Sequence, residues 1–136
     1  MKDEKHNEII REVIDEIESA TKDTRGLVFH QRRLAFSLSL GAVNLLELYL
    51  HKHDILKVGL KIDHRWFSRK KERIIEEIEK RTTSKVTDLE NFPKIINLMI
   101  LIEEKRNELA YGSPVPEDLL RNKINLFFEL RRLTKC

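Results

Sequence analysis

Arg106, Asn107 and Tyr111 bring a guanidinium, an amide and a phenol into one six-residue segment. Arg106 also continues a stripe whose spacings of four and three residues are those of one helix face, formed with Ile95, Met99, Ile102 and Leu109. A guanidinium is permanently charged, so a buried one needs an anion, a carbonyl or a partner chain. Two interpretations stay open: contact with a ligand phosphate, or an ion pair with Glu103 one turn earlier while Tyr111 packs against the protein.

A second candidate is the stretch of residues 63–71, DHRWFSRKK, in which cations alternate with two aromatic residues. Such a mixture lets bases stack while phosphates are neutralised. The alternative is that Trp66 and Phe67 lie under the protein while the cations are solvated. The predicted nucleic-acid-binding residues are therefore Arg65, Trp66, Arg69, Lys70, Lys71 and Arg106.

Residues 106–133, RNELAYGSPVPEDLLRNKINLFFELRRL, resemble the C-terminal half of a HEPN domain, a small helical family associated with nucleotides and RNA. Its members carry an arginine, commonly a following polar residue, and a histidine four to six positions after the arginine. Arg106, Asn107, Leu109 and Gly112 match this pattern, and residues 115–117 resemble the start of the last helix of the family. Tyr111 stands where the histidine would be. Ser113 occupies the position of a tyrosine that is nucleotide-modified in some members.

The resemblance implies that Arg106, Asn107 and Tyr111 are the catalytic candidates of a metal-independent endoribonuclease. Histidine suits the proton transfers of RNA cleavage because its pKa lies near neutral pH, whereas a phenol titrates near 10. We therefore expect binding of RNA or nucleotide phosphate with weakened or absent cleavage. Two alternatives remain: an active ribonuclease in which Tyr111, His30 or His64 transfers the proton, and a helical protein-interaction module without nucleic-acid binding.

Asn44 lies in an apolar segment where HEPN relatives frequently carry an acid that faces the cleft. Glu47, one turn later, is a possible substitute for that acid. The other interpretation is that the Asn44 amide hydrogen-bonds across the protein or across a dimer interface.

The length of 136 residues suits one domain, spanning residues 1–136. Cys136 is the single cysteine, so no internal disulfide is expected and a reducing cytoplasm is indicated. No cofactor motif occurs, and the spacing of His51, His53, Asp54 and His64 matches no known set of metal ligands, so neither a cofactor nor a metal is expected. No signal peptide is expected, and the longest uncharged run, residues 34–46, is too short to span a bilayer.

Apolar periodicity predicts an all-α, HEPN-like up-and-down bundle of four main helices plus one short helix. The expected helices span residues 3–22, 27–51, 68–81, 93–111 and 116–133, with Gly59 as a breaker in the connector after the second. The second helix is apolar almost all round, which is typical of a buried central helix. Gly41 and Ala42 would let a neighbouring helix approach it closely.

The net charge of +3 is unevenly distributed. Residues 1–24 carry four Lys or Arg against eight Asp or Glu, whereas residues 64–73 and 121–136 each carry five against one. These basic segments would attract an anion such as RNA. The two most apolar helices exceed what one small bundle covers easily, so a homodimer is predicted. The resemblance adds a nucleotidyltransferase partner and a toxin–antitoxin or defence setting.

Overall fold

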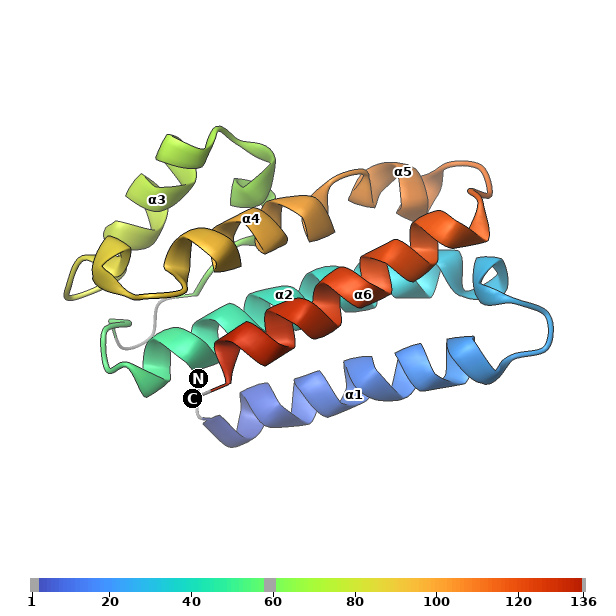
Figure 1. Ribbon diagram of the computed structural model, residues 1–136, viewed down its shortest axis with the longest axis horizontal. Coiled ribbons are helices and arrows are strands. Elements are labelled where there is room, and N and C mark those ends of the chain that lie inside the picture. The colour runs from blue at the N-terminus through green and yellow to red at the C-terminus, as the bar shows by residue number, and fades with distance from the viewer. Residues whose placement is uncertain (1–2, 58–60, 136) are drawn as a thin grey trace.

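The computed structural model describes residues 3–57 and 61–135, and all of the regular structure within them is helical (Figure 1). One isolated antiparallel bridge joins Leu56 to Thr82, and no strand occurs in these two ranges. Gly59 and Cys136 lie outside the described residues. The predicted all-α class is confirmed, with these elements: α1 (Asp3–Lys22), η1 (Leu27–His30), α2 (Gln31–Lys52), η2 (His64–Ser68), α3 (Lys71–Glu79), η3 (Val86–Asp88), α4 (Phe92–Glu103), α5 (Arg106–Tyr111) and α6 (Glu117–Thr134), where η denotes a 3-10 helix.

The long helices alternate in direction along the chain, and α4 and α5 together form the third of four rods (Figure 1). Helix α2 is the central one, because α1, α4, α5 and α6 all contact it. The short α3 stands outside these rods and contacts η2 and η3 instead. Both ends of the described chain lie at the same end of the molecule (Figure 1).

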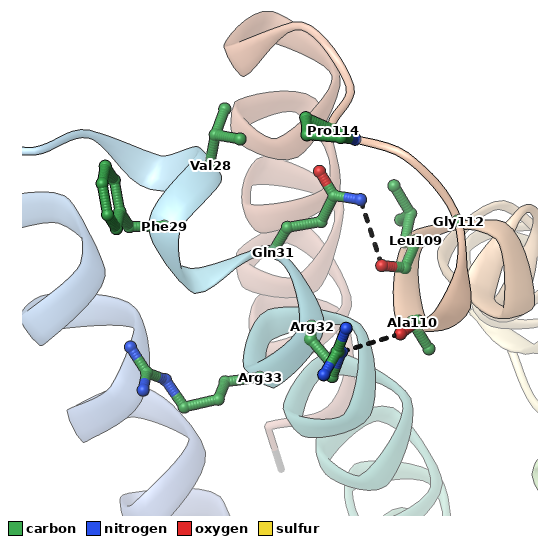
Figure 2. A pocket seen from close by; sticks show the side chains of 9 residues that line it. All are labelled: Val28, Phe29, Gln31, Arg32, Arg33, Leu109, Ala110, Gly112 and Pro114. Carbon is green, nitrogen blue, oxygen red and sulfur yellow. Dashed lines mark hydrogen bonds between the residues drawn. The ribbon is translucent and has the colours of Figure 1, made fainter.

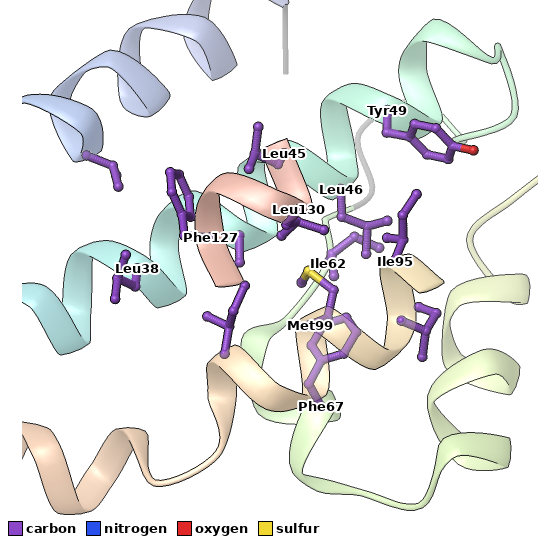
Figure 3. Packing of buried hydrophobic residues seen from close by; sticks show 14 of the residues in the cluster. Leu38, Leu45, Leu46, Tyr49, Ile62, Phe67, Ile95, Met99, Phe127 and Leu130 are labelled. Carbon is purple, nitrogen blue, oxygen red and sulfur yellow. The ribbon is translucent and has the colours of Figure 1, made fainter. Parts of the chain in front are cut away.

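The core forms where apolar faces of α2, α4 and α6 meet. Figure 3 shows Leu46 of α2, Met99 of α4 and Leu130 of α6 converging, and all three side chains are buried. Gly41 permits the close approach that its position predicts, because a Cβ there would lie 2.7 Å from the Phe127 ring and 3.0 Å from Val13. Helices α1 and α6 therefore meet α2 at one point on its surface.

Among the residues that the structure describes, one helical stretch, Leu27–Lys52, is long and apolar enough by composition to cross a membrane. Within its most apolar window, 72% of the residues are buried inside the protein. This is the burial of a core helix, which explains why nearly all of its faces are apolar.

Three of the predicted helices are divided or shortened in the structure. The predicted second helix over residues 27–51 consists of the 3-10 helix η1 (Leu27–His30) followed by α2 (Gln31–Lys52). Helix α3 begins at Lys71 rather than at Ser68, because residues 64–68 form the separate 3-10 helix η2. The side chain of Asp63 caps η2 by accepting a hydrogen bond from the backbone N–H of Arg65. The predicted helix over residues 93–111 is in fact two helices, and the interruption between them sets the position of Arg106.

Candidate functional site

A break between α4 and α5 turns the chain immediately before Arg106. Lys105 adopts the left-handed conformation, with φ of 65°, which interrupts the helix although its neighbours are good helix formers. The ammonium of Lys123 in α6 donates to the carbonyls of Leu101 and Glu104 at 2.5 and 2.7 Å. Lys123 is itself buried, so these two carbonyls and its charge satisfy one another.

The other end of α5 is fixed by the first residues of α2 (Figure 2). Gln31 Nε2 donates to the carbonyls of Leu109 and Ser113, both at 3.1 Å, and its Oε1 accepts from the N–H of Val115 at 3.0 Å. Arg32 Nε donates to the carbonyl of Ala110 at 3.1 Å. The last carbonyls of α5 are thus satisfied by side chains, and the short helix is held at both ends.

Arg106 lies at the surface of the protein with most of its side chain covered, 17% of it being exposed. Its guanidinium stacks on the Phe36 ring of α2, 4.9 Å from the ring centre, and its Nη1 donates to Asn107 Oδ1 at 3.1 Å. The nearest carboxylate oxygen, Glu103 Oε1, is 4.0 Å from Nε. Within the described part of the chain, Arg106 Nε is buried and makes no hydrogen bond.

Glu103, the last residue of α4, is held more tightly by two other side chains. His64 Nδ1 lies 2.6 Å from Glu103 Oε1, and Ser39 Oγ donates to Glu103 Oε2 at 2.8 Å. Because both carboxylate oxygens are engaged at short range, the Arg106 ion pair is the weakest of the three contacts. The cluster joins η2, α2, α4 and α5 at one place.

Two hollows meet at this cluster, and His64, Arg65 and Arg106 line both of them. The larger, called the α2 groove here, has a volume of about 930 Å³ and includes Phe36, Ser39, Leu40, Glu47, His64 and Arg106 in its lining. The smaller, called the α5 groove, has a volume of about 610 Å³ and includes His64, Arg65, Arg69, Lys105, Arg106 and Asn107. An extended ligand crossing from one groove to the other would therefore pass His64 and Arg106.

Glu47 contributes a titratable carboxyl to the α2 groove. Burial raises its pKa to about 7, against the lowering effects of a hydrogen bond from the backbone of Ile62 and of the charge of Lys61. Asn44 lines the same groove, and its polar atoms are engaged within the bundle: its Oδ1 lies 2.9 Å from His6 Nδ1 of α1, and its Nδ2 donates to the carbonyl of Leu40 at 2.9 Å. The hydrogen-bonding interpretation of Asn44 is therefore confirmed.

Tyr111 lies apart from this polar cluster. Its side chain is 72% exposed, and its ring meets the Phe36 ring edge-on with 6.0 Å between the centres. Since Arg106 stacks on the same Phe36 ring, the two motif residues are joined through an aromatic side chain rather than by a direct polar contact.

The basic stretch of residues 63–71 divides into a buried part and an exposed part. Trp66 and Phe67 are buried, and the Arg81 guanidinium lies 4.3 Å above the Trp66 ring, so the structure supports the interpretation in which the aromatics pack inside. Of the cations, Arg65 and Arg69 line the α5 groove. The exposed Lys70 and Lys71 lie at the start of α3 and line neither groove.

The contact between His64 and Glu103 was not predicted from the sequence. The two residues are 39 positions apart, and the 3-10 helix that carries His64 has no apolar periodicity to reveal it. The only feature of the sequence that pointed to this contact was the apolar stripe of α4, because Glu103 lies one turn before Arg106 at the end of that stripe. In residues 3–57 and 61–135 no group of three or more His, Cys, Asp or Glu is placed to hold a metal ion.

Comparison of the chain with models of protein families, with curated proteins and with solved structures finds no match. The geometry around Arg106 and the sequence resemblance of residues 106–133 are therefore the two bases for a functional proposal.

Proposed function

We propose that this chain is a HEPN-like protein that binds a phosphate of RNA or of a nucleotide through Arg106. The observation that carries the proposal is the state of the guanidinium: it stacks on Phe36 and lines both grooves, its Nη1 donates to Asn107, and no described residue accepts a hydrogen bond from its Nη2. A guanidinium in this condition gains from a phosphate oxygen, because its planar fork fits two oxygens at once.

The surroundings of Arg106 favour an anion. The α5 groove holds the cations Arg65, Arg69, Lys105 and Arg106 against the carboxylates of Glu103, Glu104 and Glu108, which leaves a small excess of positive charge. Arg65 is itself paired with Asp63. Partial burial lowers the effective dielectric constant, which strengthens an interaction between a guanidinium and a phosphate. Asn107, which accepts from Arg106 Nη1, helps to orient the fork.

Tyr111 is a poor replacement for the motif histidine. Besides the weak acidity of a phenol at neutral pH, its side chain is largely exposed and contacts Phe36 rather than the polar cluster. The proposal therefore assigns phosphate binding to the motif and gives Tyr111 no part in proton transfer. By the resemblance, a cytoplasmic toxin–antitoxin or defence setting with a nucleotidyltransferase partner is part of this proposal.

A homodimer is the proposed assembly. The apolar side chains of Phe36, Leu40 and Tyr111 are exposed on α2 and α5, next to Arg106. A two-fold contact through this surface would cover them and bring two Arg106 side chains toward one cleft. We expect a dimer at micromolar concentration by light scattering and a monomer for Leu40→Glu; a monomeric wild-type protein would remove the proposed assembly.

The test of phosphate binding compares Arg106→Ala with Arg11→Ala, an exposed arginine of the acidic helix α1 that lines neither groove. Affinity for a labelled single-stranded RNA and for ATP is measured by fluorescence anisotropy at low salt, where electrostatic binding is strongest. Loss of a charge-assisted contact worth about 1.5–3 kcal/mol predicts roughly tenfold to hundredfold weaker binding for Arg106→Ala only.

Equal affinities of the wild type and Arg106→Ala, with both folded, would refute the proposal. If the wild type binds neither ligand at low salt, a protein-interaction module becomes the better interpretation. Arg106→Lys adds a finer comparison, because it keeps the charge but not the two-oxygen fork and should recover only part of the affinity.

A further inference from the structure

His64 is the histidine that the structure places beside Arg106. It enters from η2, a segment outside the motif, and its side chain is 34% exposed where the two grooves meet. Its Nδ1 is held by Glu103 at 2.6 Å, while no described residue hydrogen-bonds its Nε2. A ring held by one nitrogen presents the other to a bound molecule.

His30, the other histidine of the active-ribonuclease alternative, is arranged differently. Its Nδ1 lies 2.8 Å from Arg33 Nη2 and 3.2 Å from Glu16 Oε1, its Nε2 lies 2.8 Å from Asp23 Oδ2, and its side chain is almost wholly covered. With both ring nitrogens engaged by protein side chains, His30 joins α1 to the start of α2 and offers no nitrogen to a substrate.

We propose that His64 is the catalytic general base for cleavage of an RNA phosphodiester held by Arg106, with Glu103 as its positioning residue. This inference rests on the proposed binding of phosphate by Arg106. It goes beyond that proposal because it restores catalysis to a site whose motif position holds tyrosine.

The hydrogen bonds of Glu103 determine which ring nitrogen of the neutral His64 side chain carries the proton. Ser39 donates to Glu103 Oε2 at 2.8 Å, which leaves Oε1 to accept the Nδ1–H of His64. A proton on Nδ1 places the lone pair of the neutral ring on Nε2, the atom needed by a base. Glu103 also stabilises the imidazolium that forms when Nε2 takes a proton.

The chemical step is an attack within the RNA strand. The 2′-oxygen forms a bond to phosphorus, its proton passes to His64 Nε2, and the bond from phosphorus to the 5′-oxygen breaks. The departing 5′-oxygen takes a proton from water in the open groove, and His64 returns its proton to solvent. The products are a 2′,3′-cyclic phosphate and a 5′-hydroxyl, and the step consumes no oxidant or reductant. Arg106 offsets the charge that grows on the phosphate oxygens.

The experiment uses the full chain with a labelled single-stranded RNA, in the presence of a chelator, and identifies the end groups of the products. His64→Asn is the decisive variant, because its amide N–H can still donate to Glu103 while the Nε2 acceptor is lost. We expect cleavage to fall by roughly 10²- to 10⁴-fold with RNA affinity almost unchanged. His53→Asn, which changes an exposed histidine at the end of α2, is the matched control and should cleave normally.

Glu103→Gln tests positioning separately from folding. Removing its charge should lower kcat while leaving the affinity for RNA equal or higher, because a carboxylate 4.0 Å from Arg106 competes with phosphate. A merely structural role would weaken binding and cleavage together. Glu103→Asp, which keeps the charge, should recover part of kcat.

The possible results distinguish catalysis by His64 from phosphate binding by Arg106. RNA binding that depends on Arg106 without any cleavage by the wild type would overturn the catalytic role of His64 and leave the binding proposal standing. Cleavage that survives in His64→Asn would also overturn it. Absence of RNA binding would instead show that the underlying proposal has failed. Because purified Arg106→Ala should also lose cleavage, a contaminating nuclease would be recognised by its persistence in that variant.

Discussion

Glu47→Gln should change how the stability of this protein depends on pH. Glu47 is 3% exposed, and burial raises the pKa of its carboxyl from 4.5 to about 7. A folded-state pKa above the unfolded value means that the folded protein binds the proton more tightly. Stability is therefore fully present below the unfolded pKa and is lost as the pH rises through the folded pKa. At 1.36 kcal/mol per unit, the loss amounts to about 3 kcal/mol above neutral pH.

The assay is urea unfolding of the wild type and of Glu47→Gln at a series of pH values from about 5 to about 8, where most of this loss develops. Glutamine cannot ionise, so the variant should become more stable relative to the wild type by about 2–3 kcal/mol across that range. Glu12→Gln, at an exposed position of α1, is the control and should follow the wild-type curve. Parallel curves for Glu47→Gln and the wild type would refute the claim that a buried, ionising carboxyl lies in the α2 groove.

Two further predictions concern buried side chains outside the grooves. His6 is fully buried and burial lowers its pKa from 6.5, so its contribution to stability is present above that value and is lost as the pH falls below it. In His6→Asn, which can keep a hydrogen bond to Asn44, the free energy of unfolding should fall less on acidification, as measured by urea unfolding; an equal fall would contradict this. Lys123→Met should cost about 2 kcal/mol of stability and weaken RNA binding, because the carbonyls of Leu101 and Glu104 lose their donor where the chain turns into Arg106. Lys85→Met, at an exposed lysine, is the control for Lys123→Met, and unchanged RNA affinity in a folded Lys123→Met would contradict the role of the break.

Helices with a regular apolar stripe were predicted well. The predicted first helix matches α1, Asp3–Lys22, because Ile10, Val13 and Ile17 repeat at three and four positions and all face the core. The prediction that the helix ends before Gly112 was also correct, because α5 ends at Tyr111. Glycine suits this position, since a Cβ there would lie 2.4 Å from the carbonyl oxygen of Glu108. Local spacing and steric limits are properties of a short segment, so the sequence carries them directly.

The break at Lys105 was not predictable from its own segment. Residues 103–106 are all good helix formers, and the side chain that satisfies the interrupted carbonyls, Lys123, comes from α6. Tertiary hydrogen bonds overrode local propensity there. The position of Arg106 could be predicted from the apolar stripe of its own segment. Its neighbours His64, Ser39 and Phe36 come from distant segments, so their contacts appear only in the folded chain.

Glu103 explains how one cluster can serve both proposed roles. A single carboxylate between an imidazole and a guanidinium could bind both and leave neither available to a ligand. Here its oxygens lie 2.6 Å from His64 Nδ1 and 2.8 Å from Ser39 Oγ, whereas Arg106 Nε is 4.0 Å away. The carboxylate thus orients the imidazole, while the arginine is held mainly by its stacking on Phe36. This stacking uses none of the hydrogen-bond donors of the guanidinium. A phosphate can therefore bind Arg106 without displacing Glu103 from His64, so phosphate binding and proton transfer do not compete for the same contact.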